Sequence, residues 1–548
     1  MEHNIASVFE AVESAVKDRP CIVCDTQVLT YREFGDRSRQ FANVLLDAGL
    51  GRSTPRSELA DHESGQDHVA VYLHNSAEYL EVMLGAFAAR VVPFNVNYRY
   101  VAEELEYLLC DAGTRGVVYH SAFAPVMAEV RDRLVDLELL LQVDDGSGVD
   151  LLPGAEWYHT ARDARPTQID PAVRAARCPD DLYLLYTGGT TGRPKGVLWR
   201  QADIFVTSLG GRRRDDATEW AALSDIAGAA ADHHTSVMPA SPFMHGAAHW
   251  LAFSALTNGD TVVIGSNFEH FDADALLDSV EEHDVEVLLI VGDAFGRPLA
   301  DALERRDHEV SSLLAIVSGG AALSTGVAER LLAAAPSAVL LDGLGASESG
   351  QQASRVSTVG SVRNDRYFIP MTTAVVLDDG LEAVAEPGHD GIGWLAQTGR
   401  IPLGYLGDAE RSAATFPSID GVRYAVPGDR VRRLRDGSIE LLGRDAATIN
   451  TGGEKVFAEE VEQALLQHPA VVDCVVVGRP SLRWGDEVVA VVQLRSGDDP
   501  SDEELLAEAG RHVARFKLPK ALLRCEAMVR SPSGKADYRW ARAQAVGA

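Results

Sequence analysis

The sequence predicts an α/β fold, with a large N-terminal domain of layered, mostly parallel sheets and a small, mobile α+β C-terminal domain. Two observations predict it. Short apolar segments alternate with amphipathic segments along most of the chain, and this pattern changes near residue 444. The chain has 548 residues, a length that allows roughly two to four domains. We therefore expect one domain over residues 1–443 and a second over residues 444–548.

The alternation is clearest in the large domain. Residues 5–16 carry apolar side chains at helical spacing, and the apolar run at residues 182–186 predicts a buried strand. Residues 272–283 place their apolar residues on one face of a helix. Further buried strands are expected at residues 285–291, 314–317 and 338–341. This order of strands and helices favours parallel sheets covered by helices.

The C-terminal region has a pattern of its own. Before it, Asp436-Gly437 predicts a hairpin turn between two short strands. After residue 444, the expected elements are a helix near residues 457–468, strands at 471–477 and 487–494, and a helix near 502–515. These elements form a compact unit that we expect to move as one body.

Composition excludes some functional classes. The formal net charge of −31 would repel a polyanion, so no nucleic-acid partner is expected. No segment approaches the roughly 20 apolar residues of a membrane span. The first residues lack the basic and apolar regions of a secretory signal, so a cytoplasmic location is expected. The oligomeric state stays open, with a homodimer as one alternative.

The most informative segment is residues 187–196, Thr-Gly-Gly-Thr-Thr-Gly-Arg-Pro-Lys-Gly. Its four glycines allow several backbone N–H groups to turn toward one anion, and its threonine hydroxyls and Lys195 add donors. The loop suits a polyphosphate. It is not a Walker A loop, because Pro194 precedes the lysine and no Ser or Thr follows it. The alternative is a flexible surface turn.

Six further motifs follow this loop in order along the chain. The first three are 241–246 (Ser-Pro-Phe-Met-His-Gly), 318–321 (Ser-Gly-Gly-Ala) and 342–348 (Asp-Gly-Leu-Gly-Ala-Ser-Glu). The last three are 427–429 (Pro-Gly-Asp), Gly443-Arg444 with 452–454 (Gly-Gly-Glu), and 531–535 (Ser-Pro-Ser-Gly-Lys). With these motifs the chain resembles the adenylate-forming acyl-CoA synthetases, ligases and luciferases over nearly its whole length. Residues 291–298 and 449–455 are similar to those of actinobacterial fatty-acyl or steroid-side-chain CoA ligases.

The resemblance implies how ATP is held. The β- and γ-phosphates would bind the loop residues Thr187, Gly188, Gly189, Thr190, Thr191, Gly192 and Lys195. Glu348 would bind Mg²⁺, a hard cation that prefers oxygen ligands. Ser347 stands where the family more often has threonine and would hydrogen-bond the α-phosphate. Without the other motifs, Ser-Glu would indicate only a surface turn.

The resemblance also implies a nucleoside site. Adenine would lie against Gly319, Gly320 and Ala321 and against the segment Asp342, Gly343, Leu344 and Gly345. Asp429 would bind the ribose diol, and Arg444 ribose or phosphate oxygens. Many relatives have tyrosine where Leu344 stands, so we expect an apolar wall in place of stacking. Gly452, Gly453 and Glu454 belong to the loop that approaches the thiol channel of coenzyme A.

Lys535 is the expected catalytic residue of the first step. By resemblance it bridges the acyl carboxylate and the phosphate oxygens as a point charge, and then leaves the site as the C-terminal domain rotates. His245 would lie beside the acyl pocket, although an ordinary residue at the edge of the core is the alternative. Relatives often carry Asp or Lys at the hinge position that Ala446 occupies, which leaves charge-dependent control of the hinge in doubt.

The resemblance implies an acyl-CoA synthetase. Such an enzyme uses ATP to convert a carboxylic acid to acyl-AMP, then transfers the acyl group to coenzyme A and releases AMP. Gly246, Ala247 and Ala248 leave room for a long-chain or bulky, steroid-like acid, but the acid itself is not identified. The alternatives are an adenylating ligase that loads a carrier protein or stops at acyl-AMP, and an inactive acyl or nucleotide binder.

Overall fold

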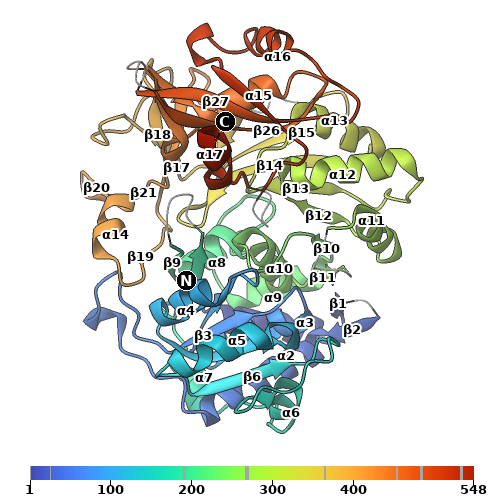
Figure 1. The fold of residues 1–548 in the computed structure, drawn as a ribbon. Coiled ribbons are helices and arrows are strands. Elements are labelled where there is room, and N and C mark those ends of the chain that lie inside the picture. Colours follow the sequence, from blue (N-terminus) through green and yellow to red (C-terminus); the bar gives the residue numbers. More distant parts are fainter. Residues whose placement is uncertain are drawn as a thin grey trace.

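The computed structural model describes residues 2–24, 26–188, 193–265, 271–362, 366–451, 454–481, 485–530 and 535–547, without the side chains of residues 446, 450, 454, 455 and 485. The chain builds a large body from its blue to orange segments, and the red C-terminal segment lies over one end of it (Figure 1). None of the described helices is long and apolar enough to cross a membrane.

The N-terminal part of the chain forms a parallel sheet. Within the described residues its strand order is β4-β3-β5-β6-β7, namely Val92–Asn95, His68–Tyr72, Thr114–His120, Leu139–Val143 and Glu156–Trp157. Successive side chains of a strand point to opposite faces. Accordingly, Val69 and Val71 pack in one core cluster, and Ala70 and Tyr72 in another.

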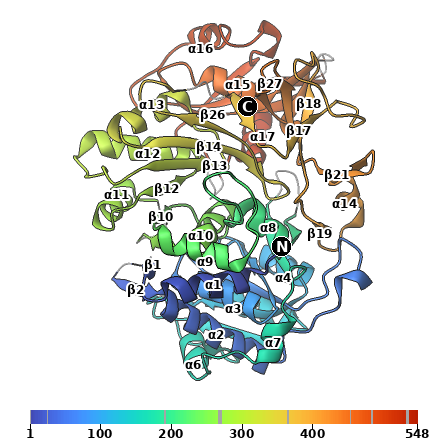
Figure 2. The ribbon, with the colours of Figure 1, turned by 180° about the vertical axis from the view of Figure 1, so that it is seen from behind.

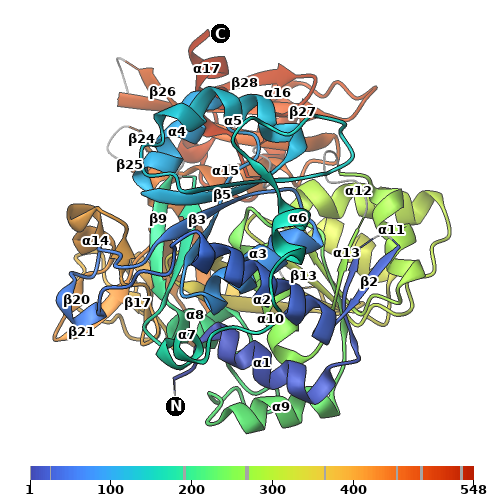
Figure 3. The ribbon, with the colours of Figure 1, turned by 90° about the horizontal axis from the view of Figure 1, so that it is seen from below.

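Helices cover both faces of this sheet. The first cluster includes residues of α2 (Tyr31–Asp47) and α3 (Ala77–Ala88). The second includes residues of α4 (Ala102–Asp111) and α5 (Ala124–Val130). Figure 3 shows β3 and β5 between these two helix pairs. The predicted helix at residues 5–16 is confirmed as α1 (Ile5–Val16) and packs in the first cluster.

A second, longer sheet carries the middle of the chain. Its parallel part runs in the order β1-β11-β10-β12-β13-β14, namely Pro20–Cys24, Thr261–Ile264, Ser236–Pro239, Val287–Ile290, Ala315–Gly319 and Val339–Ala346. The helices α11 (Ala273–Glu282), α12 (Gly292–Arg305) and α13 (Thr325–Ala334) lie along it (Figure 2). The parallel arrangement predicted from the alternation of strands and helices is confirmed here.

The same sheet becomes antiparallel after β14. β15 (Gly350–Ser357) follows β14 through a short turn and pairs with it antiparallel, because a tight hairpin cannot join parallel strands. The antiparallel pairing continues through β16 (Tyr367–Pro370), β23 (Ile439–Arg444) and β22 (Asp429–Arg433). The predicted hairpin at Asp436-Gly437 is confirmed, with φ of +87° at Gly437.

The C-terminal region folds around its own sheet. The strands are β24 (Thr448–Thr451), β25 (Glu454–Phe457), β26 (Val471–Ser481), β27 (Gly485–Leu494) and β28 (Ala521–Cys525). The helices α15 (Ala458–Leu465) and α16 (Asp502–Ala509) pack on one face, and α17 (Tyr538–Gly547) on the other. Both α15 and α16 are shorter than predicted. His468 precedes Pro469, and the residue before a proline disfavours helix; Gly510 follows the last residue of α16.

Candidate active site

The predicted phosphate loop connects two buried strands, β8 (Leu182–Thr187) and β9 (Lys195–Arg200). They pair antiparallel, with Thr187 opposite Lys195, so the two ends of the loop lie side by side. Among the described residues, a Cβ atom at Gly188 would meet nothing within 4 Å. The predicted phosphate ligands Gly189, Thr190, Thr191 and Gly192 lie outside the described residues.

Lys195 and the predicted magnesium ligand Glu348 form an ion pair, and a third residue contacts both. The Lys195 ammonium lies 3.0 Å from Glu348 Oε1. The Tyr405 hydroxyl accepts a hydrogen bond from Lys195 Nζ at 2.5 Å and donates one to Glu348 Oε1 at 2.8 Å. Tyr405 belongs to β19 (Gly404–Tyr405), which pairs with β9. Three separate segments thus converge on one buried carboxylate.

The environment of Glu348 keeps it ionised. Burial alone would raise the pKa of this carboxyl, but the Lys195 charge and the hydrogen bonds from Lys195 and Tyr405, with Arg444 beyond them, hold it below its ordinary value. Lys195 and Tyr405 both contact Oε1, and neither of these contacts engages Oε2. An ionised carboxylate with an oxygen to spare fits a Mg²⁺ ion, which prefers oxygen ligands.

Strand β9 also fixes the backbone beside Glu348. Residues 195, 197 and 199 share one face of the strand, because side chains alternate along it. From this face the buried Trp199 indole N–H donates to the Ser347 carbonyl oxygen at 3.0 Å. The predicted α-phosphate ligand Ser347 therefore lies in the β14–β15 turn, anchored through its backbone and half-buried.

The predicted adenine segments lie next to each other. They occupy the carboxyl ends of the neighbouring parallel strands β13 and β14, where Gly319 is opposite Gly343. Ligands of open α/β sheets bind beyond such strand ends. Gly320 follows β13 and has φ of +85°. Among the residues that the structure describes, a Cβ there would meet only Val291, at 3.9 Å.

The remaining residues of these segments have structural contacts. Asp342 forms a buried ion pair with Arg355 at 2.6 Å. Leu344 is half-buried and packs against a core cluster, as expected of an apolar wall. A Cβ at Gly345 would lie 2.3 Å from the Gly350 carbonyl oxygen, so only glycine fits there. Ala321 follows Gly320 and is half-buried. Adenine contact at these positions remains a prediction.

Asp429 and Arg444 face each other across the β22–β23 hairpin. Arg444 Nε donates to Asp429 Oδ1 at 3.1 Å. The second oxygen, Oδ2, is buried and finds no hydrogen-bond partner among the residues that the structure describes. A buried acceptor without a partner costs free energy, and a ribose hydroxyl would satisfy it. This geometry fits the predicted role of Asp429.

Lys535, the predicted catalytic residue, belongs to the C-terminal domain and lies close to the charged residues Glu348, Asp429 and Arg444. Its side chain is solvent-exposed, yet the surrounding protein lowers its pKa by desolvation and by the positive Arg444, against the opposing effects of Glu348 and Asp429. Its ammonium also contributes to lowering the pKa of His245. The structure thus places Lys535 near Glu348 and Asp429 of the large domain, which are more than 100 positions away in sequence.

His245 precedes α10 (Gly246–Asn258). Burial first, and then Lys535, lower the pKa of its imidazole to about 3, so the ring is neutral at physiological pH. Its Nε2 atom is buried and has no hydrogen-bond partner within the described part of the chain. A buried nitrogen left open beside Lys535 supports a role toward a ligand over the role of an ordinary core residue.

Two asparagines that the sequence analysis did not identify fix the backbone at Tyr186, before the phosphate loop, and around residues 241–244, before His245. Asn95 donates to the carbonyl oxygens of Tyr186 and Met244, at 2.9 and 2.6 Å, and accepts from Tyr186 N–H. Asn75 donates to the Ser241 carbonyl oxygen and accepts from Phe243 N–H. The polar end of the apolar run at residues 91–95 is the signal that could have identified Asn95.

The predicted hinge and thiol-channel residues are described only in part. Gly452 and Gly453 lie outside the described residues, and Glu454 is placed by its backbone alone, at the start of β25. Ala446 lies in a short 3₁₀ turn, Asp445–Ala447, which connects β23 to the C-terminal domain. The roles proposed for these four residues remain predictions.

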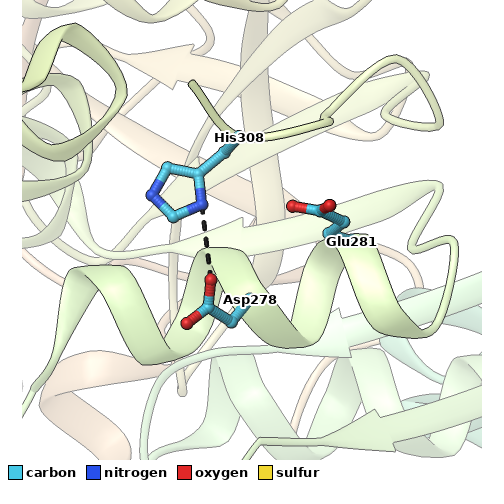
Figure 4. Close-up of side chains that lie close together, drawn as sticks. All are labelled: Asp278, Glu281 and His308. Carbon is cyan, nitrogen blue, oxygen red and sulfur yellow. Dashed lines mark ion pairs between the residues drawn. The ribbon is translucent and has the colours of Figure 1, made fainter. Parts of the chain in front are cut away.

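In the described part of the chain, the side chains of Asp278, Glu281 and His308 lie close enough together to hold a metal ion (Figure 4). It lies on α11 and just after α12, on different elements from those that carry Glu348. Asp278 is already paired with Arg306 at 2.9 Å and lies 3.6 Å from His308. The cluster is thus part of an ion-pair network between these two elements.

The chain is similar to known proteins along nearly its whole length. Residues 9–405 match the model of the AMP-binding enzyme family, and residues 460–535 match that of the AMP-binding enzyme C-terminal domain. The chain is 50% identical to the medium-chain acyl-CoA ligase Mig of Mycobacterium avium, over 99% of this chain and 98% of that one. It is 38% identical to a medium/long-chain-fatty-acid–CoA/3-oxocholest-4-en-26-oate–CoA ligase of Mycobacterium tuberculosis, over 99% and 96%.

The fold is also that of a solved ligase. The crystal structure of the anthranilate CoA ligase AuaEII with anthranoyl-AMP superposes with a TM-score of 0.79 at 22% identity, covering 99% of this chain and 98% of that one. The family model matches most of the large domain and includes Lys195, Glu348 and Tyr405. The chain therefore belongs to the AMP-binding enzyme family.

Proposed function

We propose that the protein is an AMP-forming acyl-CoA ligase that activates medium- to long-chain fatty acids or a steroid side-chain acid. One arrangement carries the proposal: Lys535 of the C-terminal region is close enough to Glu348 and Asp429 of the large domain, and to Arg444 at the domain boundary, for their charges to influence its pKa. The positive charges of Lys535 and Arg444 suit a reaction between two anions, a carboxylate and ATP. The substrate class rests on the activities for which the two mycobacterial relatives are named, and the chain is 50% and 38% identical to them.

In the first step, a carboxylate oxygen of the acid attacks the α-phosphorus of ATP. A P–O bond forms, and the bond to pyrophosphate breaks. Lys535 would neutralise both reacting anions, and Lys195 would hold the phosphates that leave. Glu348 would hold a Mg²⁺ ion, which supplies positive charge to the phosphate oxygens when bound. Catalysis is then largely positioning and charge stabilisation.

In the second step, the thiol sulfur of coenzyme A attacks the acyl carbon. The C–O bond to AMP breaks, AMP leaves, and the thiol proton passes to solvent. Lys535 has no part in this step, so its withdrawal by rotation of the C-terminal domain would free the site for the thiol. The 3₁₀ turn Asp445–Ala447 is the connection about which the domain would rotate.

His245 would position the acid. Because its pKa is held near 3, the neutral imidazole can orient the carboxylate without forming a competing ion pair with it. The small residues that follow, Gly246 and Ala247, begin α10 and take up little space beside it. The acyl chain would extend along this helix.

The second candidate is a ligase that loads a carrier protein, or that stops at acyl-AMP. The adenylation chemistry is the same, so Lys195, Glu348 and Lys535 support it equally. What separates the two is the acceptor, and the two mycobacterial relatives both use coenzyme A according to their names. We therefore propose free coenzyme A as the acceptor.

A panel of acids tests the proposal. Octanoate, dodecanoate, palmitate and 3-oxocholest-4-en-26-oate would be incubated with ATP and Mg²⁺, with and without coenzyme A, and with benzoate and leucine as comparison acids. We expect pyrophosphate release and a CoA ester with at least one of the first four. Pyrophosphate release without any CoA ester would support the carrier-protein alternative, and no turnover of any acid would contradict both.

A further inference from the structure

The N-terminal turn of α15 touches the strand that leads into the hinge. Glu459 Oε1 accepts a hydrogen bond from the Arg444 backbone N–H at 3.4 Å. The contact needs glycine at the preceding position: Gly443 has φ of +130°, and a Cβ there would lie 2.3 Å from Glu459 Oε2. The side chain of a C-terminal-domain residue therefore packs directly against the last residues of the large domain.

The neighbouring residue makes a second contact between the domains. Arg366, which precedes β16, donates from Nη2 to the Glu460 carbonyl oxygen at 3.3 Å, and its Nη1 lies 3.8 Å from Glu460 Oε1. The Arg366 carbonyl oxygen accepts from Leu441 N–H of β23, which fixes the arginine to the large domain. Lys517 holds the Glu460 carboxylate from the other side, at 2.6 Å, within the C-terminal domain.

We propose that Glu459 and Arg366 form a latch that stabilises the orientation in which Lys535 faces the adenylation site. Both are positioning residues: neither is placed against ATP or the acid. The inference rests on the proposed function and its two domain orientations. Rotation about residues 445–447 would carry Glu459 and Glu460 away from Arg444 and Arg366, so both contacts belong to one orientation only.

The latch brings a carboxylate to the hinge. The hinge position itself carries the uncharged Ala446, and Glu459 reaches the neighbouring Arg444 N–H from α15. Burial raises the pKa of Glu459, but a protonated carboxyl still accepts the Arg444 N–H through its carbonyl oxygen. The contact therefore does not depend on the charge of Glu459, and glutamine should replace it.

The test compares the two half-reactions in the full-length protein. One assay measures pyrophosphate release with ATP and dodecanoate; the other measures dodecanoyl-CoA formation from supplied dodecanoyl-AMP and coenzyme A. Loss of one hydrogen bond shifts an equilibrium by about tenfold. In Glu459→Ala and in Arg366→Ala we expect the ratio of the two rates to shift about tenfold toward CoA transfer, because the ratio follows the populations of the two orientations.

Two further variants separate a latch from a general loss of structure. Glu459→Gln should restore the wild-type ratio to within about threefold, since the amide oxygen can accept the Arg444 N–H. Glu487→Gln removes the charge from an ion pair within the C-terminal domain, to Arg479 at 2.9 Å, and should leave the ratio unchanged.

Equal losses in both half-reactions, or no change in either, would overturn the latch. Because wild-type turnover is measured in the same assays, failure of the proposed function would appear there first, as no turnover of dodecanoate or dodecanoyl-AMP. An altered ratio in Glu487→Gln would also count against the proposal.

Discussion

The hydroxyl of Tyr405 donates a hydrogen bond to the Glu348 carboxylate at 2.8 Å, from a residue 57 positions further along the chain. Tyr405 is buried, and the Lys195 ammonium lies over its ring, 4.1 Å from the centroid, as well as against its hydroxyl. One tyrosine thus contacts both the cation proposed for the phosphates and the carboxylate proposed for the metal.

Tyr405→Phe removes this hydroxyl and keeps the ring. Hydrogen bonds to charged groups contribute about 1.5–3 kcal/mol, so we expect kcat/KM for ATP in acyl-AMP formation to fall about 10- to 100-fold, with a higher Mg²⁺ requirement. Steady-state pyrophosphate release measures both. Tyr119→Phe is the matched control, since it removes a buried hydroxyl that donates a hydrogen bond to Gln142 in the parallel sheet that contains β5 and β6. Equal losses in the two variants would contradict a specific role for Tyr405.

Lys535 predicts a pH dependence confined to one half-reaction. The Lys535 amine must be protonated to carry a positive charge, and its pKa is lowered from the ordinary value. As pH rises through the lowered pKa the charge is lost, so kcat/KM for acyl-AMP formation should fall at alkaline pH, with a midpoint below about 10.4. Lys535→Ala should abolish acyl-AMP formation and spare CoA transfer from supplied acyl-AMP. Parallel losses in both half-reactions would refute the two-orientation scheme.

Asp429 predicts selectivity for the ribose. Its partnerless Oδ2 atom should accept a hydrogen bond from a ribose hydroxyl. The wild-type protein should therefore prefer ATP over its 2′- or 3′-deoxy analogue by about 10- to 100-fold in kcat/KM. Asp429→Asn should weaken this preference as well as ATP use. Asp436→Asn, at the exposed turn of the same hairpin, should change neither; an unchanged preference in Asp429→Asn would remove the ribose assignment.

Glu462 predicts a stability that falls with pH. Its side chain is half-buried in the C-terminal domain, and desolvation together with Glu459 raises its pKa. Above about pH 4.3, the unfolded chain loses the proton that the folded state keeps, so the free energy of unfolding decreases as pH rises toward the folded-state pKa. Glu462→Gln cannot titrate and keeps an acceptor for the Val476 N–H.

Thermal unfolding at pH 5 and pH 8 measures this effect. The Tm of the Gln variant should change less between the two pH values than the wild-type Tm does. Glu503→Gln, at an exposed position of α16, should behave as wild type. A Gln variant with the full wild-type pH dependence would show that Glu462 is not the group responsible.

Much of the fold could be predicted from the sequence because its signals are local. The apolar spacing of residues 5–16 and the run at 182–186 correspond to α1 and β8. The direction of the strands after β14 could not be predicted from that rhythm. It depends on the short turn that contains Ser347 and Glu348, which forces an antiparallel pair.

The candidate site also has features that the sequence predicts and features that it does not. The sequence by itself determined the ordered motifs, and with them the family and the residues Lys195, Glu348, Asp429, Arg444 and Lys535. Only the tertiary structure decided which neighbours hold them: Tyr405 lies 210 positions from Lys195, and Asn95 lies 149 positions from Met244. A hydrogen bond between distant segments leaves no periodic pattern in the chain, since its partners become neighbours only when the strands that carry them are packed together.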